Sequence, residues 1–423
     1  MVLRPVQSLI VYLLVLMLYP SYLAVEIGTA QVTAGRVVGT LLLVRALVGT
    51  WHARVRLRTL DWLVIGLYGW GTFALLVTEG GFPVIENRVG VLMDMVFPYL
   101  AARLIVKDKD DLLTVAKWAA AIVVLLAVLG VVESVSGWSP YAQMKNYAVI
   151  KSTGGPVGQR WGLYRAEGPV GLHIAFGMCF VALLPLILTQ AREQSWKLGW
   201  ATAVIAAVAG TFSSMSGGPL LCFFVFAVCV GLSWRPTLVK PALILTGLLL
   251  LAIEIASTRH FYYVLSRLAF DSRTAWYRAR LIDVAFEKLP DYWLLGYGWA
   301  KPNWGMEIDM RQLTDILNEY ILQAAAYGAM AAVLFVGIIW KSISRLRDAY
   351  KWADSALVRK SAWYFGSMVV GFAAALCSVG LLGTAQVLFY TVMGVIGADV
   401  FNSVRQAPRN YLGGHQAGAI RAE

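Results

Sequence analysis

The fold of this chain is decided by stretches such as residues 112–135, LLTVAKWAAAIVVLLAVLGVVESV. An α-helix crosses the hydrocarbon core of a bilayer with about 20 predominantly apolar residues, and this stretch is long enough to do so. The strands of a transmembrane β-barrel would instead alternate between apolar and polar residues. We therefore expect a membrane-spanning helix here.

The composition of the whole chain agrees with this expectation. Of its 423 residues, 59% are apolar and only 14% are charged, and the mean hydropathy is +0.66. Soluble domains average about 45–50% apolar and about 25% charged residues, so the composition excludes a soluble globular protein and a disordered one. It supplies enough apolar residues for about a dozen spans.

Apolar runs of helical length recur along the chain. They lie at residues 8–24, 33–50, 61–78, 88–106, 112–135, 169–190, 198–214, 218–233, 241–257, 316–340, 361–380 and 383–402. The prediction is an all-α fold, a polytopic transmembrane helix bundle of about 12 spans. It forms a single membrane domain over residues 1–402, followed by a flexible cytoplasmic tail, residues 403–423.

Charge predicts the orientation of this bundle. The net charge is +12, from 36 Lys and Arg against 24 Asp and Glu. An excess of Lys and Arg in short loops marks the cytoplasmic side of a membrane protein, and we prefer this explanation to nucleic-acid binding. The basic loops 51–60, 103–111 and 341–360 share one side if both termini are cytoplasmic. The opposite loops 25–32 and 79–87 carry almost no positive charge.

Two segments are too long and too polar to be simple turns. We name residues 136–168 the first loop segment and residues 258–315 the second loop segment, and we predict that both are structured and periplasmic. Loops longer than about 12–15 residues in a compact protein are mostly functional or disordered. The many aromatic residues of these segments argue against disorder, so we expect the protein to work at this face.

The second loop segment contains a predicted helix with three arginines. Asp271 and Ser272 are good N-cap residues, and Pro290 ends a helix that runs to about Lys288. An amphipathic helix on the membrane surface fits its pattern. One of its faces carries Trp276, Ala279, Ile282 and Phe286, and its arginines are Arg273, Arg278 and Arg280.

These arginines have two readings. Arg273 and Arg280 can pair with Asp283 and Glu287 on a wet face of the helix. Alternatively, one or more of the three arginines hold a phosphate, because a guanidinium matches phosphate oxygens with two parallel hydrogen bonds and stays charged. The sequence leaves both readings open.

Polar residues also gather where two of the spans begin. Asp315, Asn318 and Glu319 lie at the mouth of run 316–340, and they are either functional groups or a helix cap with interfacial anchors. Arg160 and Arg165 precede run 169–190 on a turn that either faces the bundle interior or simply carries surface charge. The small residues at 213–219 allow close backbone approach, which serves packing or ligand binding.

A few charged residues fall inside or beside the apolar runs. Asp94 lies in run 88–106, and Arg36 and Arg45 lie in run 33–50. A charge at such depth needs a partner, and we expect a structural Asp94–arginine pair rather than a proton relay. The acidic stretch 108–111 contains an Asp-x-Asp pattern, which we interpret as the cap of the next helix rather than as a metal site.

Together these features resemble the O-antigen ligase and polymerase superfamily of bacterial envelope glycosyltransferases. The similarity covers most of the chain and includes the order of the spans and the long loop segment after run 241–257. Its motifs are Arg165-x-x-Gly-Pro, the small-residue stretch Ser213–Gly217, the start from Arg273 to Trp276, Pro290 with Gly296-x-Gly298, and Asn318-x-Tyr-Ile-Leu with Tyr327-Gly328.

The resemblance implies an activity and a site. Members move a glycan from undecaprenyl diphosphate to an acceptor at the periplasmic face of the inner membrane, without a metal or cofactor. The implied partners are an undecaprenyl-diphosphate-linked oligosaccharide, membrane lipid, and a chain-length regulator and flippase of the same pathway. The implied diphosphate-binding residues are Arg160, Arg165, Arg273, Arg278 and Arg280. The acceptor hydroxyl also needs a proton acceptor. The candidate catalytic residues are Asp315 or Glu319 for this role, and Asn318, which can only orient the hydroxyl.

Two alternatives remain open. Ligases use lipid A core as acceptor and carry a His where this chain has Leu317, so the departure favours the polymerase branch, which makes O-antigen or exopolysaccharide. The other alternative is a small-solute transporter, because twelve spans with both ends inside are common among carriers. Carriers place their binding residues at mid-membrane on interrupted helices, whereas here the polar residues gather in the two loop segments.

Overall fold

The computed structural model describes residues 3–27, 30–50, 56–149, 158–190, 197–258, 260–266, 272–300 and 316–402, together with Pro302, Trp304 and Ile308. The side chains of residues 27, 197–198 and 264–275 are outside this description. Three predicted features therefore also lie outside it: Asp315, the side chain of Arg273, and the tail 403–423.

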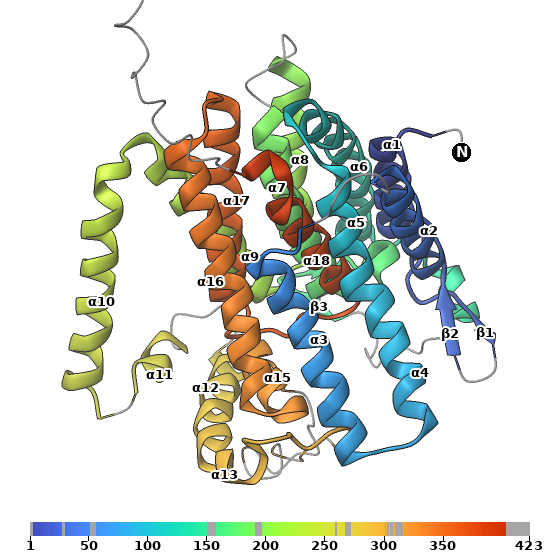
Figure 1. Ribbon diagram of the computed structural model, residues 1–423. Coiled ribbons are helices and arrows are strands. Elements are labelled where there is room, and N and C mark those ends of the chain that lie inside the picture. The colour runs from blue at the N-terminus through green and yellow to red at the C-terminus, as the bar shows by residue number, and fades with distance from the viewer. Residues whose placement is uncertain are drawn as a thin grey trace, which may run out of the picture.

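Helices dominate the described chain, and every predicted apolar run contains at least one (Figure 1). The first half holds α1 (Pro5–Leu18), α2 (Ala34–Gly49), α3 (Thr59–Thr78), α4 (Phe82–Val91), α5 (Phe97–Ile105), α6 (Lys109–Ser136), α7 (His173–Gln190) and α8 (Lys197–Ser213). The second half holds α9 (Gly217–Gly231), α10 (Val239–Ala256), α11 (Phe261–Ser266), α12 (Ser272–Glu287), α13 (Leu289–Tyr292), α15 (Glu319–Tyr327), α16 (Ala329–Trp352), α17 (Ala356–Ala375) and α18 (Gly383–Gly397).

Six helical stretches of the described chain are long and apolar enough to cross a membrane. They are α3, α6, α7, α16, α9 with the short 3₁₀ turn that follows it, and α10 with the 3₁₀ turn that precedes it. The apolar helices α1, α8 and α18 are shorter. The architecture is thus helical and compatible with a membrane, and the count of twelve spans stays a prediction.

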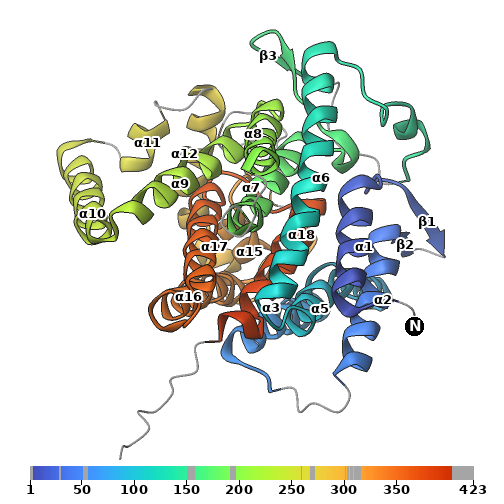
Figure 2. The ribbon, with the colours of Figure 1, turned by 90° about the horizontal axis from the view of Figure 1, so that it is seen from above.

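Burial separates the centre of the bundle from its edge. Most residues of α7 are buried inside the protein, whereas no residue of α10 is buried. Both views show α10 standing apart from the other helices (Figures 1 and 2). A helix that is apolar all round and lacks protein cover is suited to lipid rather than to water.

Two predicted runs depart from a plain α-helix. Run 316–340 is divided into α15 and α16 at Gly328, whose φ of 86° and ψ of 165° are open essentially to glycine alone. Run 88–106 contains a π-helical turn, η1 (Leu92–Val96), between α4 and α5. Both features are local changes in backbone conformation, which a hydropathy pattern does not predict.

The fold is not purely α-helical, which corrects the predicted class in detail. β1 (Ala24–Ile27) and β2 (Ala30–Thr33) form one antiparallel pair, in a connection where the sequence predicts a simple loop. β3 (Gln159–Arg160) and β4 (Leu163–Tyr164) form a second pair within the first loop segment. The strands are too short for an alternating pattern to reveal them.

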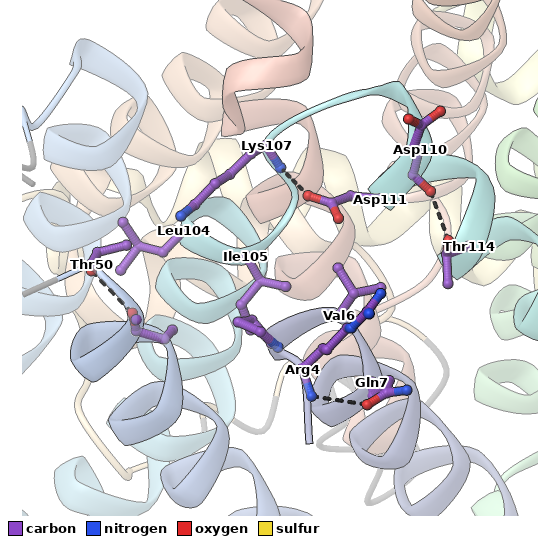
Figure 3. A pocket seen from close by; sticks show the side chains of 13 residues that line it. Arg4, Val6, Gln7, Thr50, Leu104, Ile105, Lys107, Asp110, Asp111 and Thr114 are labelled. Carbon is purple, nitrogen blue, oxygen red and sulfur yellow. Dashed lines mark hydrogen bonds between the residues drawn. The ribbon is translucent and has the colours of Figure 1, made fainter. Parts of the chain in front are cut away.

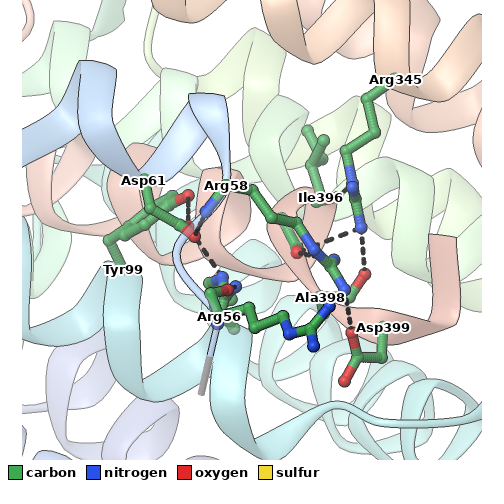
Figure 4. Close-up of polar contacts among 10 residues, drawn as sticks. Arg56, Arg58, Asp61, Tyr99, Arg345, Ile396, Ala398 and Asp399 are labelled. Carbon is green, nitrogen blue, oxygen red and sulfur yellow. Dashed lines mark hydrogen bonds and ion pairs between the residues drawn. The ribbon is translucent and has the colours of Figure 1, made fainter. Parts of the chain in front are cut away.

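Basic residues from three parts of the chain gather around the start of α3 and the end of α18 (Figure 4). Asp61 accepts a hydrogen bond from Tyr99 at 2.6 Å and pairs with Arg103 at 2.7 Å, and all three side chains are buried. Arg58 and Arg345 donate to carbonyl groups at the end of α18, where the helix dipole favours cations. These contacts join the start of α3 to the end of α5, and they join both the start of α3 and the second half of α16 to the end of α18.

Candidate functional site

The first loop segment returns to the bundle through a tight hairpin. β3 and β4 are joined by Trp161 and Gly162, whose φ angles are 55° and 79°. Positive φ at both central residues is the pattern of a type I′ turn, which matches the twist of paired strands. Trp161 is exposed at the tip, and a bulky residue in this conformation is rare and tends to occur at functional sites.

Arg160 and Arg165 both reach the turn between α8 and α9. Nη1 of Arg160 donates to the Met215 carbonyl at 3.2 Å, and Nη2 of Arg165 donates to the Ser216 hydroxyl at 3.1 Å. The backbone of the loop also contacts this turn, because the Ala166 N–H donates to the carbonyl of residue 213 at 3.0 Å. The structure therefore brings the two arginines of the first loop segment to adjacent residues of one turn.

Small residues allow this turn to sit deep among the helices. A β-carbon on Gly177 of α7 would lie 2.5 Å from the Ser214 hydroxyl, and one on Gly218 would collide with Val379. Ser216 is buried, and its hydroxyl is the one that accepts from the arginine. Packing thus explains the small residues at 213–219, and backbone and hydroxyl oxygens of the same turn also hold the arginines.

Glu133, which the sequence analysis did not single out, fixes the rest of this loop. Its two carboxylate oxygens accept hydrogen bonds from the backbone N–H groups of Glu167 and Gly168, at 3.3 and 2.9 Å. It is buried near the end of α6. An ionisable residue inside an apolar run is a recognised functional signal, and that signal was available in the sequence.

Glu167 connects the loop to two basic groups. Its Oε2 accepts from Nζ of Lys145 at 2.5 Å, and its Oε1 lies 3.7 Å from Nδ1 of His173, the first residue of α7. Burial alone would raise the pKa of the Glu167 carboxyl, but its contacts with His173 and Lys145 hold this pKa below its usual value. The carboxylate is therefore kept ionised beside the arginine-bearing turn.

The helix predicted in the second loop segment is α12, and its limits agree with the prediction. Trp276 and Phe286, on the predicted apolar face, are exposed. A neighbouring face with Tyr277, Leu281 and Val284 packs against α15 and Trp304 in a small core of its own. α12 therefore has one apolar face toward the protein and another that stays available to a membrane surface.

On α12 the predicted ion pair is present for Arg280. Its Nη1 lies 3.3 Å from Oδ2 of Asp283, which also accepts hydrogen bonds from the hydroxyls of Tyr262 and Tyr263. Burial opposes ionisation of Asp283, but these hydrogen bonds hold the pKa of its carboxyl below the usual value. Arg280 thus fits the first reading, and Arg278 is half-buried on the same helix.

The Gly296-x-Gly298 turn docks on the break between α15 and α16. The Tyr297 N–H donates to the Ala325 carbonyl at 2.6 Å, and the Ala329 N–H donates to the Trp293 carbonyl at 2.8 Å. A β-carbon at Gly296 would lie 2.5 Å from the backbone of α15, so this close approach requires glycine. Backbone groups released by the helix break are satisfied by the second loop segment, as membrane-embedded backbone requires.

Asn318 and Glu319 fasten the start of α15 to the turn that precedes α18. Asn318 caps α15 with its Oδ1, and its Nδ2 donates to the Cys377 carbonyl at 2.9 Å. Glu319 is only 2% exposed. Its two carboxylate oxygens accept from the Leu381 N–H and the Gln323 amide, each at 2.7 Å. The structure therefore gives both residues a capping role, which was the alternative left open by the sequence.

The charged residues inside the apolar runs include one ion pair and one buried arginine. Nη2 of Arg36 donates to Oδ2 of Asp94 at 2.6 Å, whereas Arg45 donates to the Leu3 carbonyl at 3.0 Å. Arg88, which the sequence analysis did not single out, is buried with its guanidinium 5.4 Å from the centroid of the Tyr327 ring. Contacts of this kind stabilise a cation inside an apolar bundle.

A pocket lies at the other end of the bundle, between the starts of α1 and α6 and the ends of α2 and α5 (Figure 3). Arg4, Lys107, Asp110 and Asp111 are among its lining residues. Asp108 accepts from the N–H groups of both aspartates, so the cap interpretation of stretch 108–111 is confirmed. The pocket is remote from Arg165 and includes residues of the basic loop 103–111.

Comparison with known proteins finds no family model that matches the chain and no similar curated protein. Among the described residues there is no group of three or more His, Cys, Asp or Glu side chains that could hold a metal ion. The function must therefore be inferred from the geometry of the residues themselves.

Proposed function

We propose that this chain is an integral-membrane glycosyltransferase that polymerises, or ligates, oligosaccharide repeat units carried on undecaprenyl diphosphate. We propose further that it spans the bacterial inner membrane about twelve times and that its active face is periplasmic. The observation that carries the proposal is the pair Arg160 and Arg165, held on adjacent residues of the α8–α9 turn. Six long apolar helices supply the membrane setting in which a polyprenyl donor resides.

The arginine pair fits a diphosphate for chemical reasons. A guanidinium is planar, remains charged at any physiological pH and forms bidentate hydrogen bonds with phosphate oxygens. The loop that carries the pair is fastened to α6 through Glu133 and to α8 through residue 213, so the cationic groups are positioned before the substrate arrives. Preorganised charge of this kind costs no reorganisation when negative charge develops.

In the proposed reaction, the oxygen of the acceptor hydroxyl attacks the anomeric carbon of the donor sugar. The bond from this carbon to the diphosphate oxygen breaks, and the leaving diphosphate carries the electrons of that bond. Arg160 and Arg165, with Arg273 and Arg278 from the second loop segment, stabilise the developing charge. Asp315, Asn318 and Glu319 are proposed to shape the acceptor side at the mouth of α15.

The proposal is tested in the source bacterium deleted for this gene and complemented with variants. We expect Arg165→Lys and Arg160→Lys to abolish polymer while folded protein and single lipid-linked repeat units remain. Each charge-assisted hydrogen bond contributes about 1.5–3 kcal/mol, and lysine lacks the bidentate fork. Polymer length is read on gels, and lipid-linked repeat units are quantified by mass spectrometry.

Arg45→Lys is the matched control, because Arg45 donates to a backbone carbonyl near the start of α1, far from the arginine-bearing turn. It should support normal polymer. Added EDTA should not change polymer synthesis in membranes. If both lysine variants at the turn made full-length polymer, the two arginines would be loop-stabilising residues and the assignment would be wrong.

A carrier is the second candidate, and one observation favours it. The break between α15 and α16 lies beside the buried cation Arg88, and carriers bind their substrates at interrupted helices. The deletion strain separates the two functions. Its membranes, supplied with lipid-linked repeat units, should fail to elongate them if the chain is the transferase. A carrier deletion would leave this elongation intact.

A further inference from the structure

We propose that His173, oriented by Glu167, accepts the proton of the acceptor hydroxyl during glycan transfer. This inference rests on the proposed function and adds a catalytic group to it. His173 follows shortly after the first loop segment. Neither the hydropathy pattern nor the sequence motifs predict a functional role for it.

The position of His173 suits a proton acceptor. It begins α7 eight residues after Arg165, and its side chain is 19% exposed, so it is held by protein on most sides and still accessible. Its Nδ1 faces Oε1 of Glu167 at 3.7 Å. The other ring nitrogen, Nε2, is then the one that takes a proton, as in hydrolytic triads where a carboxylate orients the histidine.

The distance of 3.7 Å is longer than a hydrogen bond. Contacts between a base and its orienting carboxylate are often long in a substrate-free site and shorten when the substrate binds. When the imidazole accepts the proton, the ring becomes a cation, and its electrostatic attraction to the Glu167 carboxylate increases. The observed spacing is thus compatible with a dyad that tightens during the reaction.

Glu167 is itself held in place from two directions. Glu133 accepts hydrogen bonds from the backbone of residues 167 and 168, and Lys145 binds Oε2 at 2.5 Å. These contacts leave Oε1 directed toward the imidazole. A buried carboxylate that is fixed at its backbone and at one oxygen is a good orienting group, because little conformational freedom is lost when it binds the imidazolium.

The surroundings place this dyad beside the proposed diphosphate site. Glu167 follows Arg165 by two residues, and the N–H of Ala166 between them donates to the carbonyl of residue 213, in the same turn that Arg165 reaches. The acceptor oxygen must approach the anomeric carbon next to the diphosphate, so a proton acceptor is needed at this location. The charged groups that act on the ring are Glu167, at 3.7 Å, and the two arginines of the first loop segment. Lys145 and Glu133 contact Glu167 rather than the ring.

The acidic residue described at the mouth of α15 is less suited to this step. Both oxygens of Glu319 are engaged, by the Leu381 N–H and the Gln323 amide, and its side chain is almost completely buried. Taking up a proton there would weaken the turn that leads into α18. Among the described residues, one ring nitrogen of His173 is directed toward a carboxylate, and the other is not engaged in a structural contact of this kind.

The step balances without a co-reactant. The acceptor oxygen forms its bond to the anomeric carbon while the bond from that carbon to the diphosphate oxygen breaks. The hydroxyl proton passes to Nε2 of His173, and Glu167 stabilises the imidazolium that results. Undecaprenyl diphosphate leaves as an anion, and the imidazolium later releases its proton to water.

The test uses the purified full chain in liposomes of phosphatidylethanolamine and phosphatidylglycerol. The probe is the lipid-linked repeat unit extracted from the deletion strain, and the measured quantities are the elongation rate and the affinity for undecaprenyl diphosphate. We expect His173→Gln to lower the rate by about 10²–10⁴-fold, the usual contribution of a general base. Its affinity for undecaprenyl diphosphate should stay at the wild-type value, since the arginines are intact.

The pH profile separates a base from a structural residue. The wild-type rate should fall as the pH is lowered, because only neutral imidazole accepts a proton. We call this fall in rate at low pH the acid limb of the profile. The residual activity of His173→Gln should lack it. In Glu167→Gln the limb should move to lower pH, because the imidazolium loses its stabilising carboxylate, and a merely structural role of Glu167 would not move it.

His260→Gln is the matched control. His260 also faces a glutamate, Glu254, with Nδ1 at 2.6 Å from the carboxylate, but this pair lies on the exposed connection between α10 and α11. The variant should keep the wild-type rate and pH profile. Thermal unfolding is recorded for every variant, and if His173→Gln does not fold, the shift of the acid limb in Glu167→Gln decides.

Failures of the two proposals look different. If His173→Gln elongates at the wild-type rate with the same acid limb while Arg165→Lys is inactive, the base assignment is wrong and the transferase stands. An unmoved acid limb in a folded Glu167→Gln would likewise overturn the dyad. If the wild-type protein neither elongates the repeat unit nor binds undecaprenyl diphosphate, the proposed function itself is wrong.

Discussion

Arg36 and Arg45 show how strongly the role of one residue depends on the helix face that carries it. Both lie on α2, and nine residues at about 100° each place them on opposite faces. Arg36 binds Asp94 in the π-helical turn η1, whereas Arg45 binds the backbone near the start of α1. The sequence predicted an arginine partner for Asp94, and the helix geometry decides which one.

We predict that Asp94→Asn lowers the amount of folded protein and leaves the specific activity unchanged. The substitution removes the charge that compensates Arg36, and hydrogen bonds between charged groups contribute about 1.5–3 kcal/mol. The partial exposure of the pair, 24% and 27%, places the expected loss at the lower end of that range. Thermal unfolding of the purified variants measures it.

The control is Asp348→Asn, which removes an exposed ion pair with Arg347 and should change stability by less than about 1 kcal/mol. Normal abundance of Asp94→Asn together with lost activity would contradict the structural role and would revive the carrier.

Site residues could be predicted from the sequence only where a residue type and a motif coincide. Arg160 and Arg165 were singled out because a polar, aromatic loop segment with arginines is unusual in so apolar a chain, and the structure brings both to one turn. Glu133 and His173 were missed because each lies at the edge of an apolar run, where hydropathy averages hide a single charge. Their significance comes from contacts across long sequence separations.

At the level of elements, the break at Gly328 links the second loop segment to the bundle. Two backbone hydrogen bonds cross between the loop and the broken helix, at Tyr297 and Ala329. The sequence motif Tyr327-Gly328 therefore corresponds to a change of backbone direction. A continuous helix over run 316–340 was expected because its apolar pattern continues through the glycine.

We predict that Gly328→Ala destabilises the protein and reduces polymer synthesis. A side chain at this φ of 86° costs about 1–3 kcal/mol, and the new β-carbon would also collide with the Leu294 carbonyl. The control is Gly366→Ala in α17, where no atom lies within 4 Å of the added carbon. It should be neutral or stabilising by up to about 1 kcal/mol, because alanine favours helix.

Thermal unfolding in detergent compares the two variants. Equal melting temperatures for Gly328→Ala and Gly366→Ala would show that the break is not required by the fold.

The limits of α12 were predicted well because capping residues and a proline mark them. The hairpin β3–β4 could not be predicted, since two-residue strands carry no periodicity.

At the level of the whole molecule, basic residues from distant parts of the chain lie close together. Arg58 and Arg345 bind carbonyl groups at the end of α18 (Figure 4), and Arg103 donates to the Arg56 carbonyl beside them. At the other end, Glu79 at the end of α3 accepts from the Trp299 N–H of the second loop segment at 2.6 Å. Hydropathy and loop charge predict on which side these connections lie, and they do not predict that α10 stands apart.

We predict that both loop segments face the periplasm. In a cysteine-free background, Gln159→Cys and Asp291→Cys, both at exposed positions, should react with a membrane-impermeant thiol reagent in intact spheroplasts. Ser355→Cys, between α16 and α17, should react only after the membrane is opened. The reverse pattern would invert the topology and remove a periplasmic mechanism.

The most direct test of the central claim is the affinity of the purified protein for undecaprenyl diphosphate, measured for the wild type, Arg165→Lys and the control Arg45→Lys. If Arg165 holds the diphosphate, the lysine variant should bind about 10–100-fold more weakly, which corresponds to the loss of one charge-assisted bidentate contact. Arg45→Lys should bind like the wild type. Equal affinities for all three proteins would contradict the account.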